Sequence, residues 1–193
     1  MILIVLPDIP EEDRLLTRAR QGDIDALREI YVAYFPPIFQ YIRLRVDDVQ
    51  QAEDLAGDVF LKMIKAFKGS NAPHHSLRGW LFQVARNAMN DHYGKVKHFT
   101  TDTLEEWVPS GDDVNPEIQL IREMTREQSR QAVQRLDFDQ QEVIILRFGH
   151  ALSIKETSAV MGKSPSAIKS LQFRAINNLR RNLQAVRIKQ TDG

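Results

Sequence analysis

Residues 153–181, SIKETSAVMGKSPSAIKSLQFRAINNLRR, have the pattern of two short helices joined by a tight turn. Ser153 and Glu156 are spaced as a capping box, which predicts a helix that begins directly after the serine. Gly162 stands where a left-handed helix end favours glycine. Ser164 can cap a second helix, and the proline that follows it suits a first helical position. Together these features predict a helix-turn-helix.

The second helix of this pair is predicted to contact DNA. Small polar side chains allow close approach to base edges, and lysine and arginine can reach guanine or phosphate. Residues 126–193 carry 12 basic and 6 acidic residues, a net charge of +6. An ordinary helical hairpin within a core is the alternative, but the caps, the glycine and the basic second helix all favour DNA binding. The candidate contact residues are Ser166, Lys169, Ser170, Phe173, Arg174 and Arg181.

Nearly all the remaining segments show helical periodicity, and alternating strand patterns are absent. The pair Pro36-Pro37 is predicted to end one helix and start another. Asp47 or Asp48, Ser76, and Asp139 paired with Glu142 are predicted helix caps. We therefore expect an all-α chain of two small helical domains.

A long segment without periodicity separates the two halves. Residues 96–125 carry 2 basic and 7 acidic residues. We expect a domain at 1–95, a flexible acidic linker at 96–124 and a domain at 125–193. A single helical domain with a long loop is the alternative, although structureless loops of this length are uncommon within compact domains.

The first half has its own charge asymmetry. Residues 47–58 hold five acids and no base, a composition that would repel DNA and suits a protein surface. Alternatively, these acids only favour their own helix dipole. Residues 68–95 are basic and include Trp80, His92 and Tyr93, a combination suited to single-stranded nucleic acid. Core packing is the favoured interpretation of Trp80.

Several classes of function find no support in the sequence. No cysteine is present, which excludes disulfides and thiolate metal sites and favours a cytoplasmic protein. No metalloenzyme spacing, phosphate-binding glycine loop or nucleophile motif occurs, so we expect no enzyme, cofactor or metal site. The opening residues MILIVLP are too short for a membrane span; they are either a packing arm or an artefact of the start.

Four stretches together resemble the extracytoplasmic-function (ECF) sigma factors of the bacterial sigma-70 superfamily. They are AEDLAGDVFLKMIKAF, LRGWLFQVARNAMNDHYG, DFDQQEVIILRFGHALSIKETSAVMG and SPSAIKSLQFRAINNLRR, in the order found in that family. The resemblance implies a sigma-2-like domain, a sigma-4-like domain and a promoter-recognition subunit of RNA polymerase. A free-standing helix-turn-helix regulator is the alternative function.

The resemblance also implies roles for individual residues. Those expected to dock on core RNA polymerase are Asp54, Leu55, Asp58, Phe60 and Leu61. Those expected at the minus-ten promoter element are Asn71, His74, His75, Arg78, Trp80, Arg86, Asn87 and Asn90. The six residues of the helix-turn-helix would read the minus-thirty-five element. The implied partners are core polymerase, promoter DNA and an anti-sigma factor, with no small-molecule substrate and no membrane contact.

Overall fold

The computed structural model describes residues 9–46, 48–69, 72–73, 76–93 and 131–191, and every regular element in these ranges is a helix. The all-α prediction is confirmed. The chain divides into two compact units, one built from helices of the first half and the other from helices of the second. The predicted linker at 96–124 lies outside the described residues, so its flexibility and its boundaries stay predictions.

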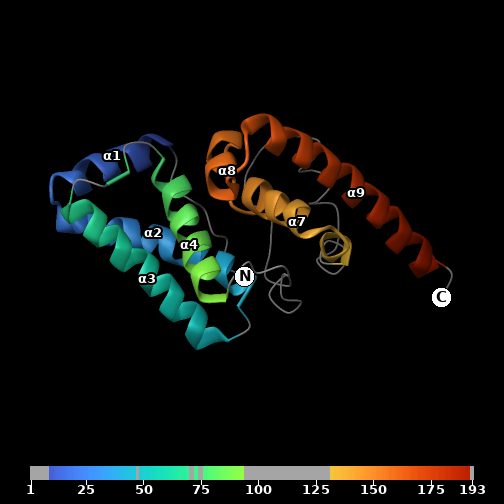
Figure 1. Cartoon of the computed structure of the whole chain (residues 1–193), viewed down its shortest axis with the longest axis horizontal. Helices are drawn as coiled ribbons and strands as arrows, with labels where there is room; N and C mark the ends of the chain where they lie inside the picture. The colour runs from blue at the N-terminus through green and yellow to red at the C-terminus, as the bar shows by residue number, and fades with distance from the viewer. Residues whose placement is uncertain (1–8, 47, 70–71, 74–75, 94–130, 192–193) are drawn as a thin grey trace. The chain divides into compact units, whose positions relative to one another are not determined.

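The first unit is a four-helix bundle (Figure 1). Its helices are α1 (Ile9–Arg20), α2 (Ile24–Arg43), α3 (Val49–Lys68) and α4 (Leu77–Tyr93). Helix α2 packs against the other three and contributes the fully buried Ile30, Tyr34, Ile38 and Tyr41. The Tyr41 ring meets Phe82 of α4 edge to face, with the two ring centroids 5.1 Å apart. This is a favoured arrangement for a buried aromatic pair, and it joins α2 to α4 in the core.

The prediction that Pro36-Pro37 separates two helices is wrong, because α2 runs through both prolines. Each proline removes a helical hydrogen bond, and an interior proline costs about 3 kcal/mol. The side chains of Tyr34 and Ile38 are fully buried on either side of the pair, and Pro37 is buried with them. Tertiary packing on this face therefore outweighs the local preference to break the helix.

The predicted caps of α3 and α4 are confirmed. Asp48 caps α3 and accepts a hydrogen bond from Gln51 N at 2.9 Å. The Ser76 hydroxyl accepts one from Gly79 N at 3.0 Å, at the start of α4. Because each cap lies within three residues of its donor, sequence spacing located Ser76 and narrowed the cap of α3 to Asp47 or Asp48, of which the structure selects Asp48.

A charged clasp closes the corner between α1 and α2. Gly22 has a φ of +84° and allows the tight reversal, after which Asp23 caps α2. Arg18 lies 2.8 Å from the Asp23 carboxylate and 3.0 Å from that of Glu29. The hydrogen bond from Arg18 holds the pKa of Asp23 below its usual range. The contact between Arg18 and Asp23 therefore persists below the ordinary carboxyl pKa and weakens as the pH falls through the lowered pKa of Asp23.

The second unit contains α7 (Phe138–Ile144), the π-helical turn η2 (Ile145–Gly149), α8 (Ile154–Met161) and α9 (Pro165–Thr191). The predicted capping pair Asp139 and Glu142 is wrong. Asp137, two residues earlier, caps α7 by accepting from Gln140 N at 2.9 Å. Asp139 instead lies within the first turn, with its carboxylate 3.0 Å from Lys163 Nζ.

A strained residue follows the π-helical turn. Ala151 has a φ of +52°, in the left-handed region that alanine rarely adopts. Its side chain is exposed, so packing does not compensate directly for the strain. The strain is therefore relieved by removing the β-carbon.

We predict that Ala151→Gly raises the free energy of unfolding of this unit by about 0.5–1 kcal/mol, since glycine tolerates positive φ. Ala151→Val should lower it, because a β-branched side chain is disfavoured more strongly there. Urea denaturation followed by circular dichroism measures both. A glycine variant less stable than the parent would contradict this interpretation of the turn.

Candidate nucleic-acid and protein interfaces

The helix-turn-helix forms as its caps predict. Ser153 Oγ accepts from Glu156 N at 3.2 Å, and the Glu156 carboxylate accepts from Ser153 N at 2.6 Å. Gly162 adopts φ 65° and ψ 31°, the left-handed end expected of it. Ser164 Oγ accepts from Ala167 N at 3.2 Å at the start of α9. The geometry of the turn is thus fixed by residues within it.

Helix α9 presents the predicted contact residues to solvent. Ile168 and Leu171 are buried, whereas Phe173 is 66% exposed. An exposed aromatic beside basic and small polar side chains matches a surface that meets base edges and phosphates. All six predicted residues are exposed: Ser166, Lys169, Ser170, Phe173, Arg174 and Arg181. The side chain of Arg181 donates to Asn178, which directs its guanidinium along the helix.

Polar side chains of neighbouring elements hold α9 from behind. Arg147, in the π-helical turn, donates from Nε to Gln172 Oε1 at 2.9 Å and from its Nη1 to the Leu152 carbonyl. Asn178 Nδ2 donates to Gln140 Oε1 at 2.8 Å. These bonds connect α9 to η2 at Gln172 and to α7 at Asn178, two separate positions along the helix. The position of the exposed face is consequently determined by residues that sequence spacing did not reveal.

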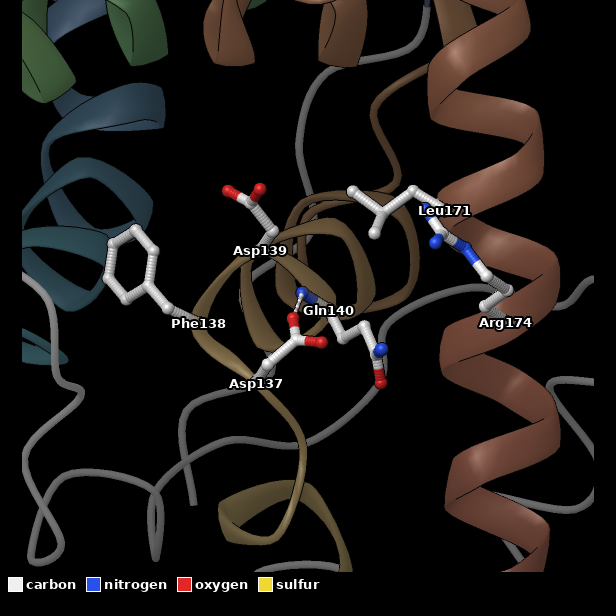
Figure 2. Close-up of a pocket in the computed structure, with 6 residues that line it drawn as sticks. All are labelled: Asp137, Phe138, Asp139, Gln140, Leu171 and Arg174. Atoms are coloured by element: carbon white, nitrogen blue, oxygen red, sulfur yellow. Dashed lines mark hydrogen bonds between the residues drawn. The ribbon is translucent and has the colours of Figure 1, made fainter.

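An open pocket of about 470 Å³ lies beside α9, between it and the start of α7 (Figure 2). Its lining residues are Asp137, Phe138, Asp139, Gln140, Leu171 and Arg174. Figure 2 shows Arg174 and Leu171 on one wall and the acids on the other. Among the described residues, no group of three or more histidine, aspartate or glutamate side chains is placed to hold a metal ion. The pocket therefore offers mixed charge and apolar surface, with no arrangement for metal chemistry.

An acidic face runs along α3, formed by Gln50, Asp54, Asp58 and Leu61. All four side chains are exposed, and Leu61 is 56% exposed. The other two predicted docking residues, Leu55 and Phe60, are buried. Phe60 packs edge to face on Tyr31, with the ring centroids 5.0 Å apart. Of the five predicted docking residues, the exposed Asp54, Asp58 and Leu61 are thus accessible, while the two buried ones pack beneath them.

The predicted minus-ten residues divide between two environments. On α4, Asn87 is exposed, and Trp80, Arg86 and Asn90 are half-buried. Core packing thus describes Trp80 only in part. Arg78 is buried, with Nε 2.7 Å from the Glu12 carboxylate. Asn71, His74 and His75 lie outside the described residues.

Sequence reasoning missed two features of this region. Gln83 is exposed on α4 at helical spacing from Trp80 and Asn87, so the periodicity of the helix could have identified it. Glu12 is buried against the start of α4, 65 residues away in sequence from Leu77. Nothing in the local pattern links such distant residues.

Comparison with known families agrees with both units. Residues 30–98 match the family model for sigma-70 region 2, and residues 132–181 match that for sigma-70 region 4. The sigma factor YlaC of Bacillus subtilis is 30% identical over 164 residues, which cover 82% of this chain and 92% of YlaC. The chain is an ECF sigma factor of the sigma-70 family. It is therefore a promoter-directing subunit of RNA polymerase, and the alternative of a free-standing regulator is not favoured.

Other sigma factors are similar over much of their length. The ECF RNA polymerase sigma factor BldN of Streptomyces coelicolor is 34% identical over 170 residues. This match covers 88% of the present chain, which spans 64% of the length of BldN.

Two solved structures show the same fold. CnrH, in complex with the cytosolic domain of CnrY, matches with a TM-score of 0.64 at 21% identity, over 91% of this chain and 98% of CnrH. RpoE of Bartonella quintana, in complex with the anti-sigma factor NepR, matches with a TM-score of 0.58 at 20% identity. This match covers 83% of the present chain and 98% of RpoE. In the part of the chain that is described, no helix is long and apolar enough to cross a membrane.

We predict that Arg147→Ala in this sigma factor lowers the free energy of unfolding of the second unit by about 1–3 kcal/mol, because partly buried acceptors lose a charged donor. Lys155→Ala, at an exposed position of α8, is the control and should change it by less than about 0.5 kcal/mol. Thermal and urea unfolding compare the two variants. Equal stability would show that Arg147 does not brace α9.

Proposed function

We propose that three surfaces of this sigma factor divide the work of initiation. The acidic face of α3 docks on core RNA polymerase, the exposed side of α4 meets the minus-ten element, and α9 reads the minus-thirty-five element. The order of the two matched sigma-70 regions along the chain supports this division. The buried Leu55, Phe60 and Arg78 are left out of the proposed contact surfaces and are assigned to support them.

The acidic face of α3 is the observation that carries the proposal. Asp54 and Asp58 are exposed one helical turn apart, and Leu61 exposes its apolar side chain beside them. Phosphate would be repelled by these carboxylates, whereas a basic or polar protein surface would be attracted. A DNA-binding regulator that acts alone has no need of this face, but a polymerase subunit does.

On α4, the proposed contact with DNA uses side chains that a separated strand can reach. Trp80 and Asn90 are half-buried, and Gln83 and Asn87 are exposed on the same helix. An aromatic ring accepts an unstacked base, and amides can bond its edge. These chemistries suit a single-stranded or opening duplex better than a closed one.

The double variant Asp54→Arg with Asp58→Arg is expected to abolish binding to core polymerase and leave the fold intact, because charge reversal at a docked polar contact costs several kcal/mol. Asp58→Arg is also made as a single variant. Its matched control is Asp13→Arg, a charge reversal at an exposed position on α1, outside the proposed face. Fluorescence anisotropy with purified core polymerase measures the affinity, and circular dichroism measures folding. Unchanged affinity in the double variant would refute the docking face.

Lys169→Ala and Arg174→Ala are expected to weaken upstream promoter recognition, by about 1–3 kcal/mol for each side chain that bonds a base edge. If Arg174 contacts phosphate alone, its removal lowers binding to all sequences alike and reduces the salt dependence. Holoenzyme binding to a panel of minus-thirty-five variants distinguishes these cases. Lys155→Ala serves as the control, and promoter binding that is insensitive to both substitutions would show that α9 is not the reading helix.

We also propose that the protein works in the cytoplasm with polymerase and has no catalytic activity of its own. Sigma factors in general are not enzymes. An anti-sigma partner is proposed as well, since the family resemblance implies one and RpoE was solved with NepR. Such a partner would compete with polymerase for the acidic face of α3, and co-purification from the native host would identify it.

A further inference from the structure

We propose that α1 takes part in promoter opening as a positioning element, through Glu12 and Arg20, which hold the N-terminal end of α4. This end is defined as Pro73 together with Leu77 and Arg78. The inference rests on the proposed contact between α4 and the minus-ten element. It adds two residues of the first helix that touch neither DNA nor polymerase in that proposal.

Glu12 grips the first turn of α4. Its side chain is buried, with the residue only 4% exposed. One carboxylate oxygen accepts from Leu77 N at 2.6 Å, and the other lies 2.7 Å from Arg78 Nε. Tyr34 of α2 donates to the same carboxylate at 2.6 Å. Three helices therefore meet at one charged group.

The carboxylate also suits its place at a helix start. The first N–H groups of a helix have no acceptor within it, and the positive end of the dipole favours an anion there. Glu12 accepts from the N–H groups of Leu77 and Arg78 at 2.6 and 3.4 Å. The direction in which α4 begins is thus fixed by a residue of α1.

Arg20 supplies a second hold on the same N-terminal end. It lies eight residues after Glu12, which is about 12 Å along the helix. Its guanidinium donates to the carbonyl oxygen of Pro73, a buried residue just before α4. Glu12 and Arg20 therefore fix the chain at two separate points where the helix begins.

The proposed DNA-facing residues of α4 follow this N-terminal end closely. Trp80 comes two residues after Arg78, and Gln83 and Asn87 follow on the same helix. A binding group must be held to within about 0.5 Å by its supporting residues to act well. Loss of the contact made by Glu12 or Arg20 would change the position of these side chains relative to the DNA, even if the unit stays folded.

Arg20 allows this idea to be tested without loss of the fold. Removal of Glu12 would take an ion-pair partner from the buried Arg78, a change that can unfold a domain. Arg20 is itself exposed and its bond to Pro73 is part-buried, so Arg20→Ala removes a hydrogen bond but leaves no buried charge without its ion-pair partner. The decisive variant is Arg20→Ala, with Arg20→Lys as the conservative variant and Arg14→Ala, exposed on the same helix, as the matched control.

The full-length variants are assembled with core polymerase, and promoter opening is followed with a fluorescent base in the minus-ten element. Each is tested on a library with every base at each minus-ten position. Arg20→Ala is expected to slow opening on the preferred promoter about five- to tenfold and to reduce base preference at the minus-ten element. Arg20→Lys should recover part of both effects. Core affinity and preference at the minus-thirty-five element should match those of Arg14→Ala, and circular dichroism should show that the variant is folded at the assay temperature.

Two results would overturn the inference. One is opening by Arg20→Ala within about twofold of the parent, with unchanged base preference. The other is an equal decrease on all promoters without a change in preference, which indicates a lower active fraction and not a positioning effect. Failure of the parent protein itself to direct core polymerase would refute the proposed function instead, so the two failures are distinguishable.

Discussion

The Glu12 carboxylate is the interaction on which the arrangement of the first unit depends. Burial of a charged group costs several kcal/mol unless partners replace the lost water. Here the side chains of Tyr34 and Arg78 and the N–H of Leu77 supply those bonds, at 2.6–2.7 Å. They are all present only when α1, α2 and α4 are in place. One acid thereby joins three helices through hydrogen bonds and an ion pair.

The second unit uses polar bonds in a similar way, but closer to its exposed helix. Arg147 and Gln140 bond to Gln172 and Asn178 on the side of α9 that faces its neighbours. The opposite side carries Lys169 and Phe173, whose side chains are exposed to solvent. In both units, a charged or amide side chain of another element supports the helix proposed to meet DNA, at the N-terminal end of α4 and along the packed side of α9. In the proposed division of work, different residues therefore contact DNA and support the helix that does so.

What could be predicted from sequence followed the range of each interaction. The caps at Asp48, Ser76 and Ser153 involve donors three residues away, so spacing located the two serines and placed the aspartate cap within one residue. The cap of α7 was misplaced by two residues, because Asp137 and Asp139 both lie near the start of the helix and only backbone geometry shows that Asp137 is the cap. Longer-range features escaped prediction, since the bond between Glu12 and Arg78 spans 66 residues and no periodicity records it.

Burial was the other limit on prediction. Arg78 was assigned to DNA from its place in a motif, yet the structure buries it. The acidic character of residues 47–58 could be read from the sequence. The burial of Leu55 and Phe60 could not, because it depends on how α2 packs on α3. Which side of a helix is covered is a tertiary property.

The continuous course of α2 through Pro36 and Pro37 has a consequence for how the first unit folds. An isolated helix gains stability by adding one backbone bond after another, and two adjacent prolines interrupt that process. A peptide comprising Ile24–Arg43 would therefore be largely unstructured in water. The central helix can form only while its neighbours collapse onto Tyr34 and Ile38. We therefore expect the part of α2 around the prolines to be completed late, as its neighbours pack on it.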